Sequence, residues 1–223
     1  MKLRLARWLE GGRYGWLFDN EVDTLAMSKF QVFDFSAQAT FPDLLDPLLF
    51  YLLHRVNHYI ATHQGFKVFA MDESWRFIQH PKLLAFLLEA LKTARKANAA
   101  MVLATQEIGD FKMTGAAADL IRTVVQSCPN KFFLANQSID RAQHTDLFGL
   151  NDMELDRLAN LEPKGEVLLK RTDITKVLKV KVDPRSYWLY TNTPADNARR
   201  EAAIAQYGFE EALNQLARPL TPA

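Results

Sequence analysis

The chain has 223 residues, of which 48% are hydrophobic and 24% are charged, as is usual for one soluble globular domain with at most a small appendage. Its net charge of +1 excludes a global basic field that would attract nucleic acid or an anionic membrane. The single cysteine, Cys128, excludes an internal disulfide, and the longest apolar run, Leu48 to Leu53, is too short to cross a membrane, so we expect a cytoplasmic chain.

The first third of the chain predicts two helices with extended chain between them. Residues 2–10 have the pattern of a short amphipathic helix, and residues 22–35 that of two short strands joined by a turn. Residues 44–60 are apolar almost all round, so we expect a buried helix with Asp43 as its N-cap.

The middle third alternates between strand and helix patterns. Residues 66–71, 99–105 and 131–135 are short apolar runs typical of buried strands. A helix is predicted from residue 81 to about 97, and another over residues 115–126. Strands and helices that alternate at this spacing predict parallel βαβ crossovers.

The last third has a different pattern. Residues 140–159 predict two short helices, and residues 166–170 and 176–182 alternate like the strands of an antiparallel hairpin. The chain becomes helical from Pro184 onward, with helices expected over residues 195–206 and 209–217. We therefore predict an α/β fold with a mainly parallel sheet flanked by helices, a small antiparallel hairpin and C-terminal helices.

Two adjacent acids, Asp72 and Glu73, follow the strand predicted over residues 66–71. They stand where open α/β sheets bind ligands, at the carboxyl end of a strand. In nucleotide hydrolases this is the Walker B arrangement, in which the first acid holds Mg²⁺ through water and the second polarises the attacking water. The simpler interpretation, in which Asp72 only caps the turn after the strand, fits the string equally well.

Two further candidates come from the next crossover. Thr105 and Gln106 end the strand predicted over residues 99–105, where an amide can orient the attacking water or contact the terminal phosphate. Arg95 ends the intervening helix, from which a guanidinium can reach the phosphates of a neighbouring subunit. Taken alone, Gln106 fits a polar loop residue, and Arg95 fits a solvated helix C-terminus better than a catalytic residue.

Two other groups suggest different chemistry. His54 and His58 stand four residues apart, as zinc ligands do on a helix, but Arg55 replaces the usual glutamate and a third ligand is not evident. Four aromatic residues near the N-terminus suggest a stacking platform for single-stranded nucleic acid or, since few basic residues interleave them, a packed cluster or protein interface. These are Trp8, Tyr14, Trp16 and Phe18.

The string FAMDESWRFIQHPKLLAFLLEALKTARKANAAMVLATQ, from Phe69 to Gln106, resembles the TrbE/CagE/VirB family of conjugation and type IV secretion ATPases. The strings RLARWLEGGRYGWLFDN, LLFYLLHRV, CPNKFFLAN and LFGLNDMELDRL extend the resemblance to about Val182. The resemblance implies a RecA-like P-loop ATPase that works as a hexamer at the cytoplasmic face of the inner membrane. The family's task is to energise pilus assembly and substrate transfer together with other secretion components.

The resemblance also implies roles for individual residues. Asp72 is the acid on the magnesium side, and Asp72 and Thr105 are expected to bind the nucleotide. Glu73 is the catalytic glutamate, Arg95 acts on the nucleotide of the adjacent subunit, and Gln106 lies near the terminal phosphate. The expected cofactors are ATP and Mg²⁺.

The phosphate-cradling loop G-x-x-x-x-G-K-[ST] occurs nowhere in these residues. We therefore expect the C-terminal part of a longer ATPase, whether a cloned fragment, a gene remnant or a split product, that hydrolyses ATP poorly or not at all by itself. Residues 1–182 would form the ATPase part, with 1–62 upstream of the acid pair, 63–135 as the βαβ core and 136–182 as helices and hairpin. Residues 183–223 would form a helical extension.

Two alternatives stay open at this point. The chain can be a non-catalytic interaction module that docks on full-length ATPase subunits or other secretion components, or a fragment of a DNA-pumping motor of the HerA and FtsK type. Its near-neutral charge argues against DNA as more than an indirect partner. The ATPase hypothesis predicts that the acid pair, Arg95 and Gln106 converge at one rim of a single sheet.

Overall fold

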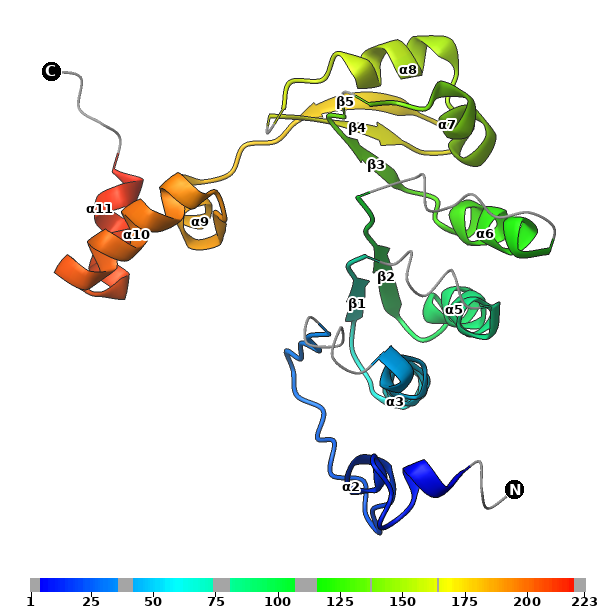
Figure 1. Ribbon diagram of the computed structural model, residues 1–223. Helices are drawn as coiled ribbons and strands as arrows, with labels where there is room; N and C mark the ends of the chain where they lie inside the picture. Colours follow the sequence, from blue (N-terminus) through cyan, green and yellow to red (C-terminus); the bar gives the residue numbers. More distant parts are fainter. Residues whose placement is uncertain are drawn as a thin grey trace, which may run out of the picture. The chain divides into compact units, whose positions relative to one another are not determined.

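The computed structural model describes residues 5–35, 42–73, 81–106, 116–136, 138–163 and 165–218. The chain divides into two compact units, Met1–Tyr51 and Leu52–Ala223, and each is described by itself (Figure 1).

An aromatic cluster forms the centre of the first unit. Trp8 ends the 3-10 helix η1 (Ala6–Trp8) and stacks on Tyr14 with ring centroids 5.0 Å apart. Phe18, at the end of α2 (Gly15–Phe18), meets Trp8 edge-on at 5.3 Å. The Tyr14 hydroxyl donates a 2.7 Å hydrogen bond to Asp43, which lies in η3 (Pro42–Leu44). The helix predicted over residues 2–10 is therefore only a short turn over its described part.

The two strands predicted within residues 22–35 do not form, although the structure describes all of these residues. Phe30 and Val32 are 85% and 67% exposed. A strand needs hydrogen bonds from a neighbouring strand, and the apolar pattern alone does not supply them. The sequence pattern therefore overestimated the regular structure of this segment.

Helix α3 (Leu45–Thr62) begins in the first unit and ends in the second. Its buried side chains recur every three to four residues along one face, while His54 and His58 are exposed, so the helix is not buried all round as predicted. The buried set is Leu49, Leu52, Leu53, Val56 and Ile60.

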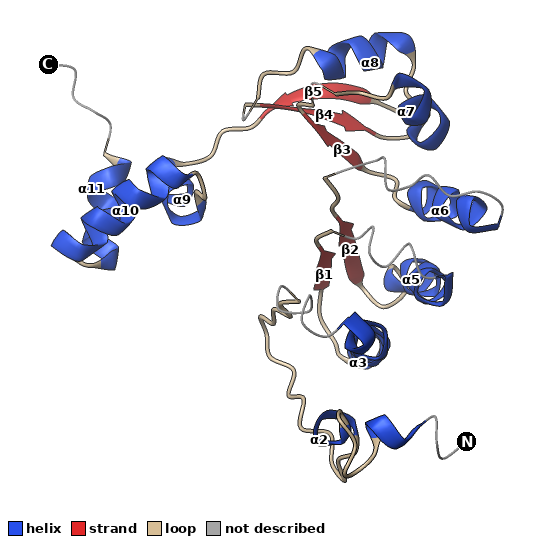
Figure 2. Cartoon of the chain, in the orientation of Figure 1, coloured by secondary structure: helices blue, strands red, loops and turns tan. Residues whose placement is uncertain are grey.

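The core of the second unit begins with a βαβ crossover (Figure 2). Strands β1 (Lys67–Met71) and β2 (Ala99–Leu103) pair in parallel, with Lys67 opposite Ala99 and Met71 opposite Leu103. The connecting helix α5 (Pro81–Ala94) packs on β2 and against α6 (Ala116–Ser127). Its leucine stripe is buried, as the 3–4 spacing predicts; these residues are Leu83, Leu84, Leu87 and Leu88.

The third predicted strand forms, but it pairs differently from the first two. Strand β3 (Lys131–Leu134) is antiparallel to β4 (Glu166–Lys170), which is antiparallel to β5 (Thr175–Lys179). In the described part of the chain, β3 thus belongs to a three-stranded sheet separate from the β1–β2 pair. The periodicity of β3 predicted a strand, but it carries no information about which neighbour that strand would find.

Two helices, α7 (Arg141–Phe148) and α8 (Asp152–Ala159), share a hydrophobic core with this antiparallel sheet. Glu154 closes a capping box with Asn151 at the start of α8. The Glu154 carboxylate also accepts hydrogen bonds from Lys170 Nζ at 2.7 Å and from Thr175 Oγ1 at 2.5 Å. These contacts fasten the hairpin to α8. The core residues are Phe133, Leu150, Leu155, Leu158, Leu161 and Leu168.

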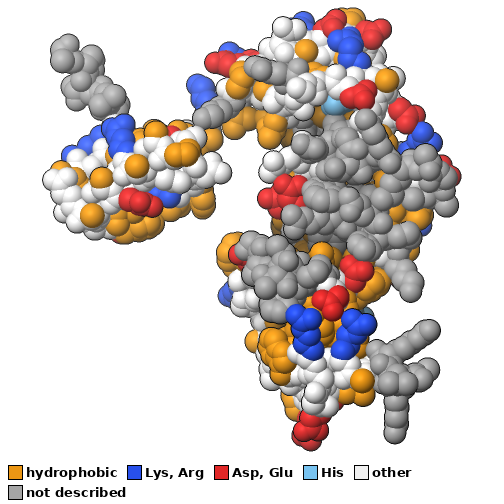
Figure 3. Space-filling view, viewed as in Figure 1, with side chains coloured by type: hydrophobic (Ala, Val, Ile, Leu, Met, Phe, Trp, Pro, Cys, Tyr) orange, Lys and Arg blue, Asp and Glu red, His pale blue; other side chains and the backbone are white. Residues whose placement is uncertain are grey.

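The chain ends in three packed helices, α9 (Pro184–Tyr190), α10 (Pro194–Tyr207) and α11 (Phe209–Ala217). Arg200 donates hydrogen bonds of 3.0–3.1 Å to the carbonyls of Trp188, Leu189 and Thr191, which satisfies the C-terminus of α9. Hydrophobic side chains gather on the visible surface of this module (Figure 3).

The predicted α/β class, with helices, a parallel sheet and a small antiparallel sheet, is confirmed. None of the helices in the described residues has both the length and the apolar character that a membrane span requires.

Candidate functional site

The acid pair lies directly after β1, at the carboxyl end of that strand. Met71 is buried, Asp72 is exposed and Glu73 is half-buried. Glu73 has a φ of 49°, in the left-handed region that glutamate rarely adopts. Its backbone N–H donates a 2.9 Å hydrogen bond to Asp72 Oδ1. The chain therefore turns sharply at Glu73, and the carboxylate of Asp72 supports the turn.

Thr105 and Gln106 follow β2 and come to the same edge of the strand pair. Met71 lies opposite Leu103, and the backbone N–H of Ala104 donates a 2.9 Å hydrogen bond to the carbonyl of Met71. Because paired strands lie about 4.8 Å apart, this bond holds the two strand ends side by side. The predicted juxtaposition of the acid pair with Thr105 and Gln106 is therefore present.

Arg95 does not join them, which corrects the prediction that all these side chains meet at one rim. It lies exposed in the turn between α5 and β2. The same turn ends at Asn98, whose carbonyl accepts a 3.1 Å hydrogen bond from the backbone N–H of Lys67, the first residue of β1. The physical reason is topological, because the helix of a βαβ unit runs back along its strands. The 14 residues of α5 span about 21 Å, so Arg95 stands at the amino edge of the strand pair.

The carboxyl edge combines two carboxylates, a hydroxyl and a neutral amide. Oxygen donors of this kind suit Mg²⁺, which keeps several waters and shares its coordination with phosphates. Among the residues that the structure describes, His, Cys, Asp and Glu do not cluster in threes as a metal cage would require. The donor set thus fits a magnesium ion held through water and substrate, as Asp72 is predicted to hold it.

The described residues supply no third metal ligand for His54 and His58, which lie exposed on α3. Three of the four N-terminal aromatic residues pack against one another, with Tyr14 only 2% exposed, while Trp16 is 74% exposed. This arrangement favours the packed-cluster interpretation over an open stacking platform.

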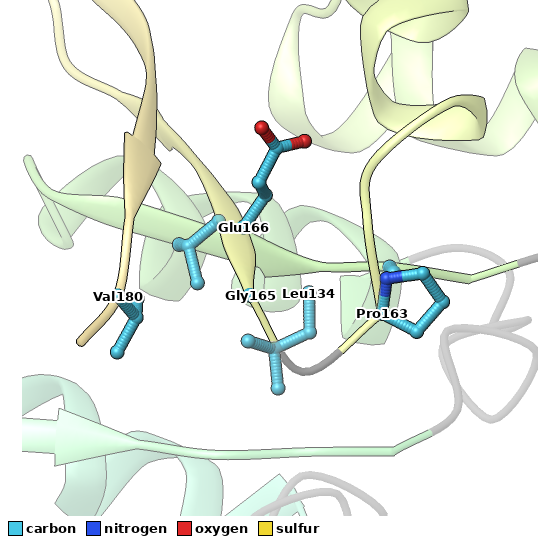
Figure 4. A pocket seen from close by; sticks show the side chains of 7 residues that line it. Leu134, Pro163, Gly165, Glu166 and Val180 are labelled. Atoms are coloured by element: carbon cyan, nitrogen blue, oxygen red, sulfur yellow. The ribbon is translucent and has the colours of Figure 1, made fainter. Parts of the chain in front are cut away.

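A pocket of about 370 Å³ lies at the end of β3 and the start of β4, and sequence reasoning did not predict it. Figure 4 shows the carboxylate of Glu166 pointing away from Leu134, so the side chains that face the pocket are mainly apolar. Pro163 and Gly165, which precede β4, are the one sequence signal of an irregular wall there. The lining residues are Leu134, Ala135, Pro163, Gly165, Glu166, Val167 and Val180.

Sequence reasoning also missed Asn98. It has a φ of 52° in the turn after α5. An asparagine just beyond a helix C-terminus is a known signal for this conformation.

Comparison with known proteins gives a consistent result. A family model described as the TraG P-loop domain matches residues 1–220. The type IV secretion system protein virB4 of Bartonella henselae is 30% identical over 155 residues, which cover 69% of this chain and 19% of that protein. A probable conjugal transfer protein TrbE of Sinorhizobium fredii is 32% identical over 170 residues, covering 74% of this chain and 25% of that protein.

A further relative and a solved structure extend this pattern. The type IV secretion system protein CagE of Helicobacter pylori is 34% identical over 165 residues, which cover 73% of this chain and 15% of that protein. The structure of VirB4 of Thermoanaerobacter pseudethanolicus superposes with a TM-score of 0.65 at 24% identity, covering 87% of this chain and 50% of that chain. This last likeness concerns the fold. The chain spans a quarter or less of the length of these three curated relatives.

Proposed function

This chain belongs to the family of TraG P-loop domains, within the TrbE/CagE/VirB group of secretion and conjugation ATPases, and we propose that it forms the water-activating part of an ATP-hydrolysing site. The observation that carries the proposal is the meeting of two strand ends at one edge. The acid pair after β1 lies beside Thr105 and Gln106 after β2, and the Ala104–Met71 hydrogen bond fixes this arrangement.

Each side chain at this edge has a proposed task. Asp72 holds the waters of a magnesium ion, and Glu73 accepts a proton from the water that attacks the terminal phosphate. Thr105 contacts the nucleotide, and Gln106 orients the attacking water without competing for its proton. The magnesium ion, when bound, supplies positive charge that offsets the charge developing on the phosphates.

Arg95 acts on a different nucleotide in this proposal, namely the one bound by the adjacent subunit. Its place at the amino edge of the β1–β2 pair, opposite the acid pair, supports a role between subunits. A guanidinium that reaches a neighbour's phosphates stabilises the charge of the transition state. Such a site requires a ring of subunits, and we propose a RecA-like hexamer.

The parent protein would work on the cytoplasmic side of the inner membrane, where hydrolysis drives pilus assembly and substrate transfer with other secretion components. The relatives named above carry the names of secretion and conjugal transfer proteins, which supports this assignment. The 223 residues contain no phosphate-cradling motif, so we propose that this chain alone hydrolyses ATP poorly or not at all.

The experiment uses an extended chain, which is residues 1–223 preceded by a segment that carries the phosphate loop. We expect ATP hydrolysis by the extended chain and little or none by residues 1–223 alone. Glu73→Gln removes the proton acceptor and should lower kcat by at least about 100-fold. Glu89→Gln, at an exposed acid on α5, is the matched control and should leave kcat unchanged.

Two outcomes would contradict the proposal. One is ATP hydrolysis by the extended chain that survives Glu73→Gln, and the other is robust turnover by residues 1–223 without the added segment.

A second function, that of a non-catalytic docking module, is favoured by apolar side chains on β3. Phe132 and Leu134 are 63% and 70% exposed, which is unusual for neighbouring strand residues on one face. If the acids are vestigial and this face binds a secretion component, the extended chain stays inactive while residues 1–223 still bind that component.

A further inference from the structure

We propose that Asn98 is a positioning residue for Arg95, which it places at the amino edge of the strand pair for action on the adjacent subunit. The inference rests on the function proposed above, because it assigns Asn98 a task only if Arg95 acts on a phosphate. No residue of the turn other than Arg95 was identified as functional from the sequence.

The turn that carries Arg95 is fixed to the helix before it. The backbone N–H of Ala97 donates to the carbonyls of Thr93 and Ala94, both at 3.1 Å, and the N–H of Asn98 donates to the carbonyl of Arg95 at 3.3 Å. The Thr93 hydroxyl bonds back to the carbonyl of Glu89 at 2.9 Å. The backbone of Arg95 is thus held by the last turn of α5 and by Asn98.

The same turn is fixed to strand β1. The carbonyl of Asn98 accepts the 3.1 Å hydrogen bond from Lys67 N, and Lys67 Nζ in turn donates to the carbonyls of Ile60 and His63, at 3.0 and 2.6 Å. Asn98 therefore joins Arg95 to a platform made from α5, β1 and the end of α3.

The left-handed conformation of Asn98 makes this connection possible. Its φ of 52° reverses the chain between the helix and β2, so that its N–H points back to Arg95 while its carbonyl points to Lys67. Asparagine and glycine adopt this conformation readily, whereas β-branched residues do not. A β-branched residue at this position must shift the turn and, with it, the backbone of Arg95.

The test measures ATP hydrolysis by the extended chain. Asn98→Val should lower kcat about tenfold or more with little change in KM for ATP, because a misplaced guanidinium affects the transition state. Asn98→Gly keeps the turn and should retain most of kcat. Lys96→Ala, at an exposed neighbour in the same turn, is the control and should leave kcat unchanged.

A double substitution separates positioning from a general loss of structure. If Asn98 acts through Arg95, Asn98→Val should cause no further loss of kcat in an Arg95→Ala background. Equal losses in both backgrounds, or loss of kcat with Asn98→Gly as large as with Asn98→Val, would overturn the inference.

The failure of the inference can be distinguished from the failure of the proposed function. An extended chain without Glu73-dependent turnover overturns both. Turnover that depends on Glu73 and Arg95 but tolerates Asn98→Val overturns the inference alone.

Discussion

The two edges of the β1–β2 strand pair carry turns that share one backbone feature but differ in residue type. Glu73 at the carboxyl edge and Asn98 at the amino edge are the two non-glycine residues with positive φ in the described part of the chain, at 49° and 52°. Asparagine suits this conformation, whereas glutamate gains nothing there. Sequence and backbone therefore agree at the amino edge and conflict at the carboxyl edge.

The conflict at Glu73 indicates where function outweighs local preference. Backbone strain of this kind persists when the surrounding structure holds it in place, and it concentrates at functional sites. The hydrogen bond from Glu73 N to Asp72 Oδ1 is one such restraint. The comparison thus supports different tasks for the two turns, which are chemistry at Glu73 and presentation of Arg95 at Asn98.

The largest expected effect comes from mixing subunits that are each damaged at one edge. Extended chains with Glu73→Gln or with Arg95→Ala should each lose at least about 100-fold in kcat, since arginines acting between subunits contribute that much or more. In a mixture, some interfaces combine an intact Glu73 from one subunit with an intact Arg95 from its neighbour. ATP turnover by the mixture should therefore clearly exceed that of either variant.

The control for this experiment is a mixture of Glu73→Gln subunits with subunits that carry both substitutions. No interface in that mixture combines an intact Glu73 with an intact Arg95, because every subunit lacks Glu73. If the first mixture also stays inactive while the unmodified subunits assemble and turn over ATP, the two edges do not serve different subunits.

The position of Arg95 shows what can be predicted from this sequence and what cannot. The leucine stripe of α5 and the apolar runs of β1 and β2 are local patterns, so these elements were predicted within a few residues. The opposite placement of Arg95 follows from the βαβ topology, and it was available from the predicted order of elements. It was missed because the candidate residues were grouped by chemistry and not traced along the crossover.

Other differences depend on partners that lie far away in the sequence. The pattern of β3 predicted a strand, but its antiparallel pairing with β4 depends on residues more than 30 positions later. Residues 22–35 have a strand-like pattern but no strand in the described structure, because strands require partners. The left-handed turn at Glu73 had no local signal, since glutamate does not predict it.

A smaller effect, in stability, should separate the two left-handed positions directly. Glycine relieves the strain at Glu73, so Glu73→Gly in residues 1–223 should raise the free energy of unfolding by roughly 0.5–1 kcal/mol. Asn98→Gly should change it by less than about 0.5 kcal/mol, because asparagine already tolerates the conformation. Urea unfolding at pH 7 measures both.

Asp72→Gly is the control for this comparison, because Asp72 has no positive φ and glycine should lower stability there. A gain in stability at Asp72, or an equal change at Glu73 and Asn98, would show that backbone strain does not distinguish the two turns.

The smallest effect concerns a second glutamate, Glu154, whose surroundings suit it as those of Glu73 do not. Burial acts to raise the pKa of Glu154, but hydrogen bonds from Lys170, Thr175 and the backbone of Asn151 outweigh it, so the pKa lies below its usual value. A lowered pKa in the folded state adds stability that is fully present above the pKa of the unfolded chain, near 4.3. That stability is lost as the pH falls through the folded pKa.

The measurement is the urea midpoint of residues 1–223 between pH 7 and pH 3. We expect the midpoint to fall as the pH drops below about 4.3, and Glu154→Gln should make this fall shallower, because the amide does not titrate. Glu89→Gln, at an exposed acid on α5, should leave the pH dependence unchanged. If the two variants respond alike, the contacts of Glu154 with Lys170 and Thr175 do not favour its ionised form. The contrast between a glutamate that the fold stabilises and one that it strains would then be lost.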